Sequence, residues 1–114
     1  MQADDATLVD LYKAASLALR FVEGLDRDAF LADPKSQAAA LHELLILGEA
    51  AKRLSPGFRQ THPEIRWREM AGMRDKLIHG YDAVDLEEVF KTLRTDVPQL
   101  LAFLDPFVSP EDRP

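Results

Sequence analysis

Three side chains suited to phosphate chemistry lie close together in the run RDKLIHGY, namely Arg74, His79 and Tyr81. Cleavage of RNA by attack of a 2′-hydroxyl on the neighbouring phosphate needs a base, an acid and a positive group. Histidine transfers protons near neutral pH, and the guanidinium of arginine is always charged and matches phosphate oxygens in pairs. Arg74 and His79 therefore have the properties that this reaction needs. Because one histidine cannot be base and acid at once, this chemistry favours two copies of the chain.

The spacing of these residues limits how they can meet. Arg74 and Tyr81 are seven residues apart and would share a helix face, whereas His79 points about 140° away from Arg74. A straight helix does not bring Arg74 and His79 together. Either Gly80 lets the backbone leave the helix so that His79 turns as a cap residue, or a second copy supplies the partner across a two-fold axis.

The elements that must position these side chains are helices, since apolar residues recur at steps of three and four and no alternating run of β-branched residues occurs. We expect an all-α, up-down bundle of four or five helices in one domain over residues 1–105, with 106–114 as a loose tail. The predicted helices span 6–22, 34–54, 67–79 and the segment after Asp85, with a short helix or turn near 26–34.

Several residues mark where these helices begin and end. Gly24 suits the end of the first helix, and Asp33 before Pro34 suits the start of the long one. The run SPG at 55–57 predicts a stop followed by a loop through Phe58, His62 and Pro63. Asp85 resembles the cap of the last helix, which Pro98 must kink or split near Asp96.

Composition excludes several classes of protein. The chain of 114 residues has no cysteine, which removes disulfides, thiol nucleophiles and the usual zinc sites. No apolar stretch is long enough for a membrane helix and the N-terminus lacks the features of an export signal, so we expect a cytoplasmic protein. P-loop, dinucleotide-binding and HExxH motifs are absent, and Asp75, Asp82 and Asp85 lack the spacing of a two-metal site, so neither cofactor nor metal is expected.

The charge is unevenly distributed. The net charge is −6, yet residues 52–81 carry seven basic and three acidic side chains. Such a pattern favours one focused anion site over a long nucleic-acid track, although scatter in surface charge would produce it too.

Each candidate also has a structural interpretation. His79 would interact favourably with the helix dipole, Arg74 would pair with a surface carboxylate, and Tyr81 would cover the helix end. We interpret His42 and His62 as packing or loop residues. Glu49, beside Gly48, is interpreted as a hydrogen-bonding group at a close contact between helices.

The segments GEAAKRLSP and HPEIRWREMAGMRDKLIHGYDAVDLEEVF, within residues 48–93, resemble the HepT-like toxins of the HEPN superfamily in order and spacing. The resemblance implies a HEPN helical bundle and a homodimer in which Arg74 and His79 line an RNA-cleaving cleft. Asp75 then takes the position of a supporting polar residue. Glycine between His79 and Tyr81, and Arg66 where a proline is expected, are mild departures that remove no reacting group.

The resemblance further implies a toxin-antitoxin system. The toxin would be a metal-independent RNA endonuclease acting on tRNA. Its antitoxin partner would be a minimal nucleotidyltransferase of the MntA type, which uses ATP to attach AMP to Tyr81 and can assemble with the toxin into a larger complex. An added phosphodiester and base would repel and block an incoming RNA phosphate. The alternatives are a noncatalytic subunit that binds substrate for such a nucleotidyltransferase, and a plain dimerising helical module.

Overall fold

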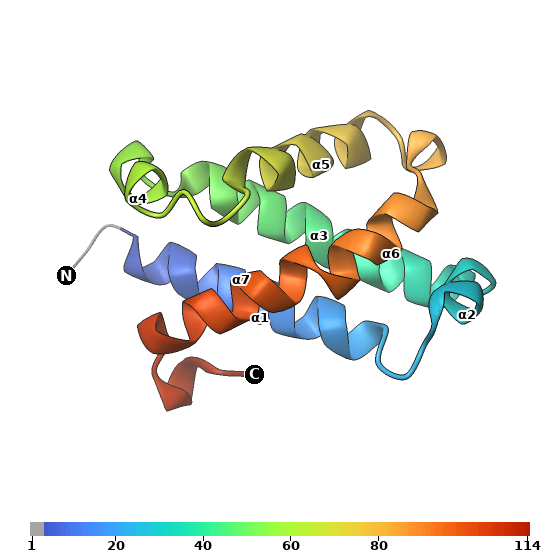
Figure 1. Cartoon of the computed structure of the whole chain (residues 1–114), viewed down its shortest axis with the longest axis horizontal. Coiled ribbons are helices and arrows are strands. Elements are labelled where there is room, and N and C mark those ends of the chain that lie inside the picture. The colour runs from blue at the N-terminus through green and yellow to red at the C-terminus, as the bar shows by residue number, and fades with distance from the viewer. Residues whose placement is uncertain (1–3) are drawn as a thin grey trace.

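The bundle is built around α3 (Pro34–Arg53), which packs against α1 (Asp5–Phe21) on one side and α5 (Trp67–His79) on the other (Figure 1). This computed structural model describes residues 4–114, with the side chain of Tyr81 left out. A last helical rod consists of α6 (Leu86–Arg94) and α7 (Asp96–Leu104), of which α7 packs on α1. Residues 4–114 contain no β-strand. The prediction of an all-α bundle is confirmed.

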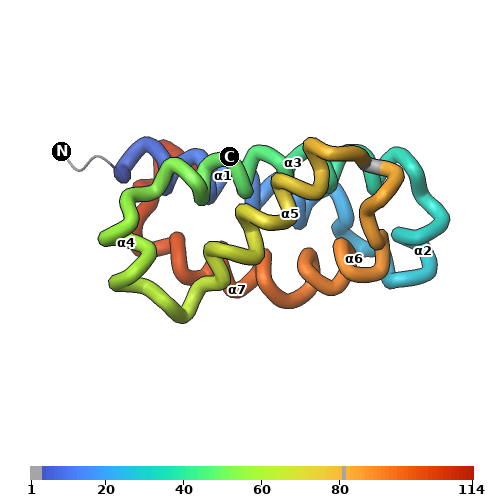
Figure 2. Tube along the Cα trace, turned by 90° about the horizontal axis from the view of Figure 1, so that it is seen from above, coloured from blue at the N-terminus to red at the C-terminus, as the bar shows by residue number. Residues whose placement is uncertain are grey.

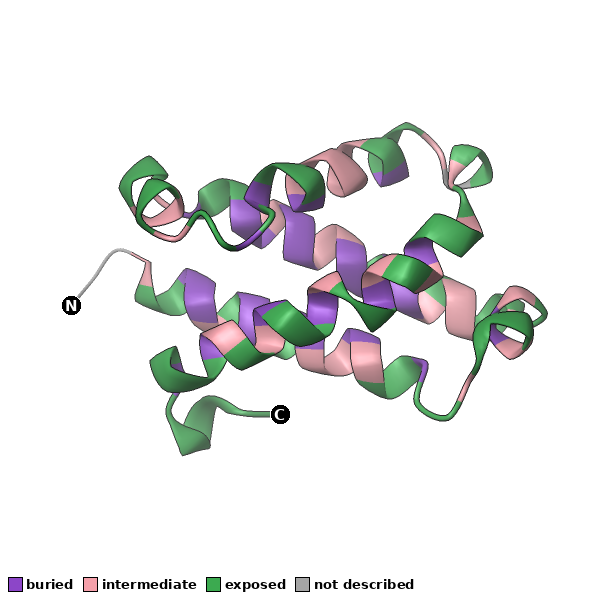
Figure 3. Cartoon of the chain, in the orientation of Figure 1, coloured by how far each residue is buried: buried purple, intermediate pink, exposed green. Residues whose placement is uncertain are grey.

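Small residues explain the close packing of α1 and α3, which form the most extensive helix interface. Alanine side chains let two helix backbones approach closely while still burying apolar surface. Six alanines on these two helices are almost wholly buried: Ala14, Ala15, Ala18, Ala40, Ala50 and Ala51. Leucine and valine residues of α6 and α7 complete the core from the other side, so that buried positions face inward on each long helix (Figure 3).

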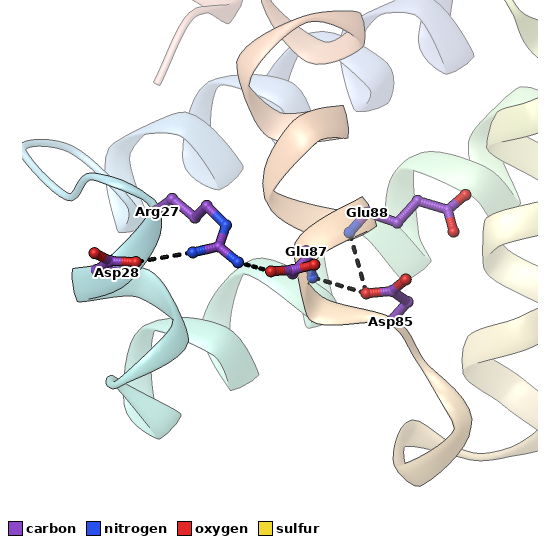
Figure 4. A network of polar contacts seen from close by, with 5 residues as sticks. All are labelled: Arg27, Asp28, Asp85, Glu87 and Glu88. Carbon is purple, nitrogen blue, oxygen red and sulfur yellow. Dashed lines mark hydrogen bonds and ion pairs between the residues drawn. The ribbon is translucent and has the colours of Figure 1, made fainter.

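Side-chain caps fix several helix starts where the sequence predicts them. Asp33 accepts a hydrogen bond from the backbone N–H of Ser36 at 3.2 Å at the start of α3. Asp85 accepts from the N–H groups of Glu87 and Glu88 at 3.0 and 3.4 Å at the start of α6 (Figure 4). Glu87 also pairs with Arg27 of the short helix α2 (Arg27–Leu31), which ties α2 to α6.

The prediction of a loop after Ser55 is wrong, because residues Pro56–Thr61 form the helix α4. Ser55 ends α3 and also caps α4, since its hydroxyl accepts from the N–H of Phe58 at 3.2 Å. Pro56 then occupies the first turn, where its missing N–H has no helical partner to lose. The same residues that stop one helix therefore begin another.

Thr95 separates α6 from α7, and Pro98 stands in the first turn of α7, so the last helix is split as predicted. Residues 106–114, which the sequence predicts to be a loose tail, contain regular structure and contact the rest of the chain. The end of the chain forms the 3-10 helices η2 (Asp105–Phe107) and η3 (Pro110–Asp112), and Val108 is buried. Arg113 donates to Asp105 at 2.7 Å and lies over the ring of Tyr12.

The helix α5 lies along the upper edge of the bundle in Figure 1 and crosses obliquely in front of it in Figure 2, where α1 and α3 are on one side and α6 and α7 on the other. It packs mainly on α3 and makes few contacts with α6 and α7. Among the helices in the described part of the chain, none is both long and apolar enough to cross a membrane.

Candidate active site

The helix that carries the RDKLIHGY run is anchored at both ends. Its start is held by Trp67, whose indole N–H donates to the carbonyl of His62 at 2.9 Å. A buried stripe of Trp67, Met70 and Leu77 faces the bundle. The helix ends at Gly80, which has φ +156° and donates its N–H to the carbonyl of Lys76 at 3.2 Å. Glycine adopts this backbone conformation without strain, so α5 stops directly after His79.

Arg74 is held against α3 by a contact that only glycine allows. A Cβ added at Gly48 would lie 2.4 Å from the Cβ of Arg74 and 2.7 Å from the carbonyl oxygen of Met70. The missing side chain therefore lets α5 approach α3 at this point, and the stem of Arg74 lies over Gly48. As a result the side chain of Arg74 is only 28% exposed, and its Nε is buried with no hydrogen-bond partner among the described side chains.

The outer end of Arg74 belongs to a cluster of three charges. Its Nη1 donates to Oδ1 of Asp75 at 3.1 Å, and the same oxygen accepts a hydrogen bond from Nζ of Lys52 at 3.0 Å. Lys52 and then Arg74, through these hydrogen bonds, hold the pKa of the Asp75 carboxyl below its ordinary value. Asp75 is therefore ionised at neutral pH, and the cluster carries one net positive charge.

His79 is the last residue of α5 and is exposed. Its neighbour Ile78 is also exposed, at 52%, although it is a large apolar residue. The helix is unbroken from Arg74 to His79, so the two side chains leave it about 140° apart. The structure shows no contact between these two described residues. A single chain thus brings Arg74 together with Asp75, and leaves His79 apart from them.

Tyr81 begins the 3-10 helix η1 (Tyr81–Ala83). Its side chain lies outside the described residues, so the expectation that it is reachable stays a prediction.

The other candidates take structural positions. His42 is exposed on α3. His62 packs in an aromatic cluster, with its ring centroid 4.5 Å from that of Phe58 and 5.0 Å from that of Phe103. Glu49 is half-buried, beside the close contact that Gly48 makes with α5. The position of His62 agrees with the packing role expected from the sequence, whereas His42 is neither packed in the core nor part of a loop.

Sequence reasoning placed a close helix contact beside Gly48 without naming the second helix, and it did not single out Lys52 as the third charge. The signal was present in GEAAK, because a glycine and a lysine four residues apart share one face of a helix. What the sequence did not show is that this face meets α5.

An open cavity of about 380 Å³ lies between α5 and the α6–α7 rod. Apolar side chains of α3 and α5 line it, including Leu44, Leu47, Met70 and Met73, and both acidic and basic residues surround it. Neither Arg74 nor His79 is among the residues that line this cavity. The charge cluster is therefore an open surface site rather than part of this cavity. Among the described residues, no three His, Cys, Asp or Glu side chains are placed to hold a metal ion.

Comparisons with known proteins converge on one family. Residues 11–107 match the family described as "Ribonuclease HepT-like". The chain is 45% identical over 93 residues to the protein named "Probable ribonuclease HepT" of Thermococcus cleftensis, covering 82% of this chain and 84% of that protein.

More distant relatives carry names of the same kind. A protein of Caldanaerobacter subterraneus named as a putative RNase is 40% identical over 79 residues, which cover 69% of this chain and 70% of that protein. Another, of Methanocaldococcus jannaschii, is 32% identical over 95 residues, which cover 83% of this chain and 87% of that protein. No solved structure matches the chain significantly.

Proposed function

Because the chain belongs to the HepT-like ribonuclease family, we propose that it is a metal-independent RNA endonuclease whose reacting groups are Arg74 and His79. The observation that carries this proposal is the placement of Arg74. Its stem is fixed over Gly48, and its guanidinium lies in a cluster with one net positive charge. Five residues later the same helix ends in the exposed imidazole of His79.

The chemistry needs no group beyond these side chains. A neutral imidazole removes the proton of the 2′-hydroxyl, and the oxygen attacks the adjacent phosphorus. The bond from phosphorus to the 5′-oxygen breaks, and a protonated imidazole donates a proton to that oxygen. The products are a 2′,3′-cyclic phosphate and a 5′-hydroxyl. Arg74 stabilises the extra negative charge on the phosphorane, where a fixed cation lowers the barrier most.

We infer that two copies of the chain form the working site. One imidazole cannot accept and donate protons in the same step, and within one chain His79 lies apart from Arg74. The exposed side chain of Ile78, directly before His79, offers apolar surface for a contact between two α5 helices. A two-fold axis at this face would give one shared cleft with two guanidinium and two imidazole groups.

A mixed dimer tests both the proposed ribonuclease activity and the proposal that two chains share one cleft. Wild-type and His79→Ala chains with different affinity tags are co-expressed, and the dimer that carries both tags is purified. RNA cleavage is measured in the presence of a chelator. We expect the mixed dimer to cleave at least about tenfold more slowly than the wild-type dimer, because the shared cleft then holds a single imidazole, which cannot remove and donate a proton in the same step.

The other outcomes are equally informative. A mixed dimer with the mean activity of its parents would mean that each chain holds a complete site of its own. Cleavage by the wild-type protein that stops with chelator would contradict metal independence. A wild-type protein that never cleaves RNA would favour the noncatalytic binding subunit instead.

We further propose that the chain is the toxin of a toxin-antitoxin pair, that its substrate is tRNA, and that a nucleotidyltransferase of the MntA type silences it by attaching AMP to Tyr81. The support is the family match and the position of Tyr81, which follows His79 and Gly80 at the end of α5. An AMP group there would place a negative phosphodiester beside the cleft and repel RNA.

The chain has two tyrosines, which gives this silencing a matched test. Tyr81→Phe should still cleave tRNA but should gain no AMP and lose no activity when incubated with the nucleotidyltransferase and ATP, as measured by intact mass and by cleavage. Tyr12→Phe, at a buried position of α1, should be modified and silenced like the wild type. Modification of Tyr81→Phe would place the acceptor elsewhere.

A further inference from the structure

Lys52 lies at the candidate site although it belongs to α3, whereas Arg74 and His79 belong to α5. Its Nζ is 3.0 Å from Oδ1 of Asp75, the oxygen that also accepts from Nη1 of Arg74 at 3.1 Å. Lys52 follows Gly48 by four residues, about one helical turn, so both lie on the face of α3 that meets α5. The glycine contact that fixes Arg74 therefore also sets the position of Lys52.

The charges of these three groups explain what Lys52 contributes. Arg74 and Asp75 alone form a pair with no net charge, and a carboxylate bound to a guanidinium weakens its attraction for a phosphate. Lys52 donates a hydrogen bond to the same carboxylate oxygen, so its ammonium group offsets part of the negative charge of Asp75. Hydrogen bonding by Lys52 is the largest cause of the lowered pKa of Asp75. The Asp75 carboxylate therefore binds both Lys52 and Arg74 rather than Arg74 alone.

We propose that Lys52 is a positioning residue for RNA cleavage: its ammonium group shares the Asp75 carboxylate with Arg74 and so leaves the guanidinium able to stabilise charge on the phosphate. This role rests on the proposed ribonuclease function and adds a residue of α3 to its site. Lys52 acts through Asp75 and Arg74, and RNA need not contact it.

The competing interpretation is an ordinary surface ion pair, and the next residue supplies one for comparison. Arg53 pairs with Asp10 of α1 through Nη2 and Oδ2 at 3.0 Å, the same separation as in the Lys52 pair. Lys52 and Arg53 are 44% and 51% exposed, so removal of either side chain removes a similar surface ion pair. Asp75, the partner of Lys52, also accepts a hydrogen bond from Arg74, and no such second link is seen for Asp10 in residues 4–114.

The test compares RNA cleavage by Lys52→Met and Arg53→Met, each of which keeps an unbranched side chain and loses one charge. We expect Lys52→Met to lower kcat about tenfold with little change in KM, because the missing effect falls on charge that develops in the transition state. Lys52→Arg should restore most of the rate. Arg53→Met should cleave like the wild type.

A double-mutant cycle with Asp75→Asn shows whether Lys52 acts through the carboxylate. In the Asp75→Asn background there is no negative charge to share, so Lys52→Met should change kcat less than about twofold. The pKa of the Asp75 carboxyl, measured by NMR, should rise in Lys52→Met and stay unchanged in Arg53→Met.

The role is overturned if Lys52→Met cleaves as fast as Arg53→Met, or if it loses the same factor with and without the Asp75 carboxylate. These failures differ from failure of the proposed function, which would appear as absence of cleavage by the wild-type protein itself. If the wild-type protein cleaves RNA and Lys52→Met cleaves it equally fast, only the positioning role of Lys52 is overturned, and the proposed function stands.

Discussion

Replacing His79 by alanine lowers kcat for RNA cleavage by a factor of about 10²–10⁴, the range over which a positioned acid or base contributes. The expected loss is this large because, in the proposed mechanism, the imidazoles of two copies supply both proton transfers. His79 is exposed at the end of α5, so its removal costs the protein only a favourable interaction with the helix dipole. That interaction contributes at most about 1 kcal/mol to the free energy of unfolding at an exposed site.

His42→Ala is the matched control, since His42 is also an exposed histidine on a helix but lies on α3. Single-turnover cleavage and denaturant unfolding of both variants separate catalysis from stability. His42→Ala should cleave like the wild type. Full cleavage by a correctly folded His79→Ala dimer would rule out His79 as the proton-transfer group.

Replacing Gly48 by alanine should destabilise the protein and impair the site together. The new Cβ would lie 2.4 Å from the Cβ of Arg74 and 2.7 Å from the carbonyl oxygen of Met70, and the backbone oxygen moves only if the whole helix moves. Alanine favours a helix over glycine by up to about 1 kcal/mol. Overpacking costs about 1–3 kcal/mol, so we expect a net loss in the free energy of unfolding.

The same change should lower activity, because separation of α3 from α5 displaces Arg74. A misplacement of about 1 Å in a catalytic group can cost about 10²-fold in rate. Gly72→Ala is the control: Gly72 is also helical, but an added Cβ there meets no atom within 4 Å. The Gly72→Ala substitution should raise the free energy of unfolding by about 0.5–1 kcal/mol. If denaturant unfolding shows Gly48→Ala to be as stable as Gly72→Ala, the close contact is not a constraint.

The fold was predictable from the sequence where local signals decide it. The apolar spacing over Trp67–His79 gave that helix its observed bounds, and Asp33 and Asp85 cap helices as expected. Ser55 and Pro56 show the limit, because a residue that ends one helix and caps the next has the same sequence signature as a loop. The anchoring of Arg113 over Tyr12 joins the two ends of the chain, and no local pattern reports such a contact.

The candidate site was predictable in its residue types but not in its arrangement. The run RDKLIHGY identified Arg74, His79 and Asp75 from chemistry and resemblance. The link from Lys52 to Asp75 spans 23 residues and depends on how α3 crosses α5, which a sequence does not state. The proposed meeting of Arg74 with His79 needs a second copy of the chain, and the geometry of such a contact is not encoded in any spacing within one chain.

The helix α5 carries Arg74 and His79 yet buries three residues, Trp67, Met70 and Leu77, whereas α3 buries eight. The exposed positions of α5 can therefore vary at small cost in folding free energy, since surface substitutions usually change it by less than about 0.5 kcal/mol. Such an arrangement separates the positions that folding constrains, mainly on α3, from exposed positions of α5 that can be substituted without loss of the fold.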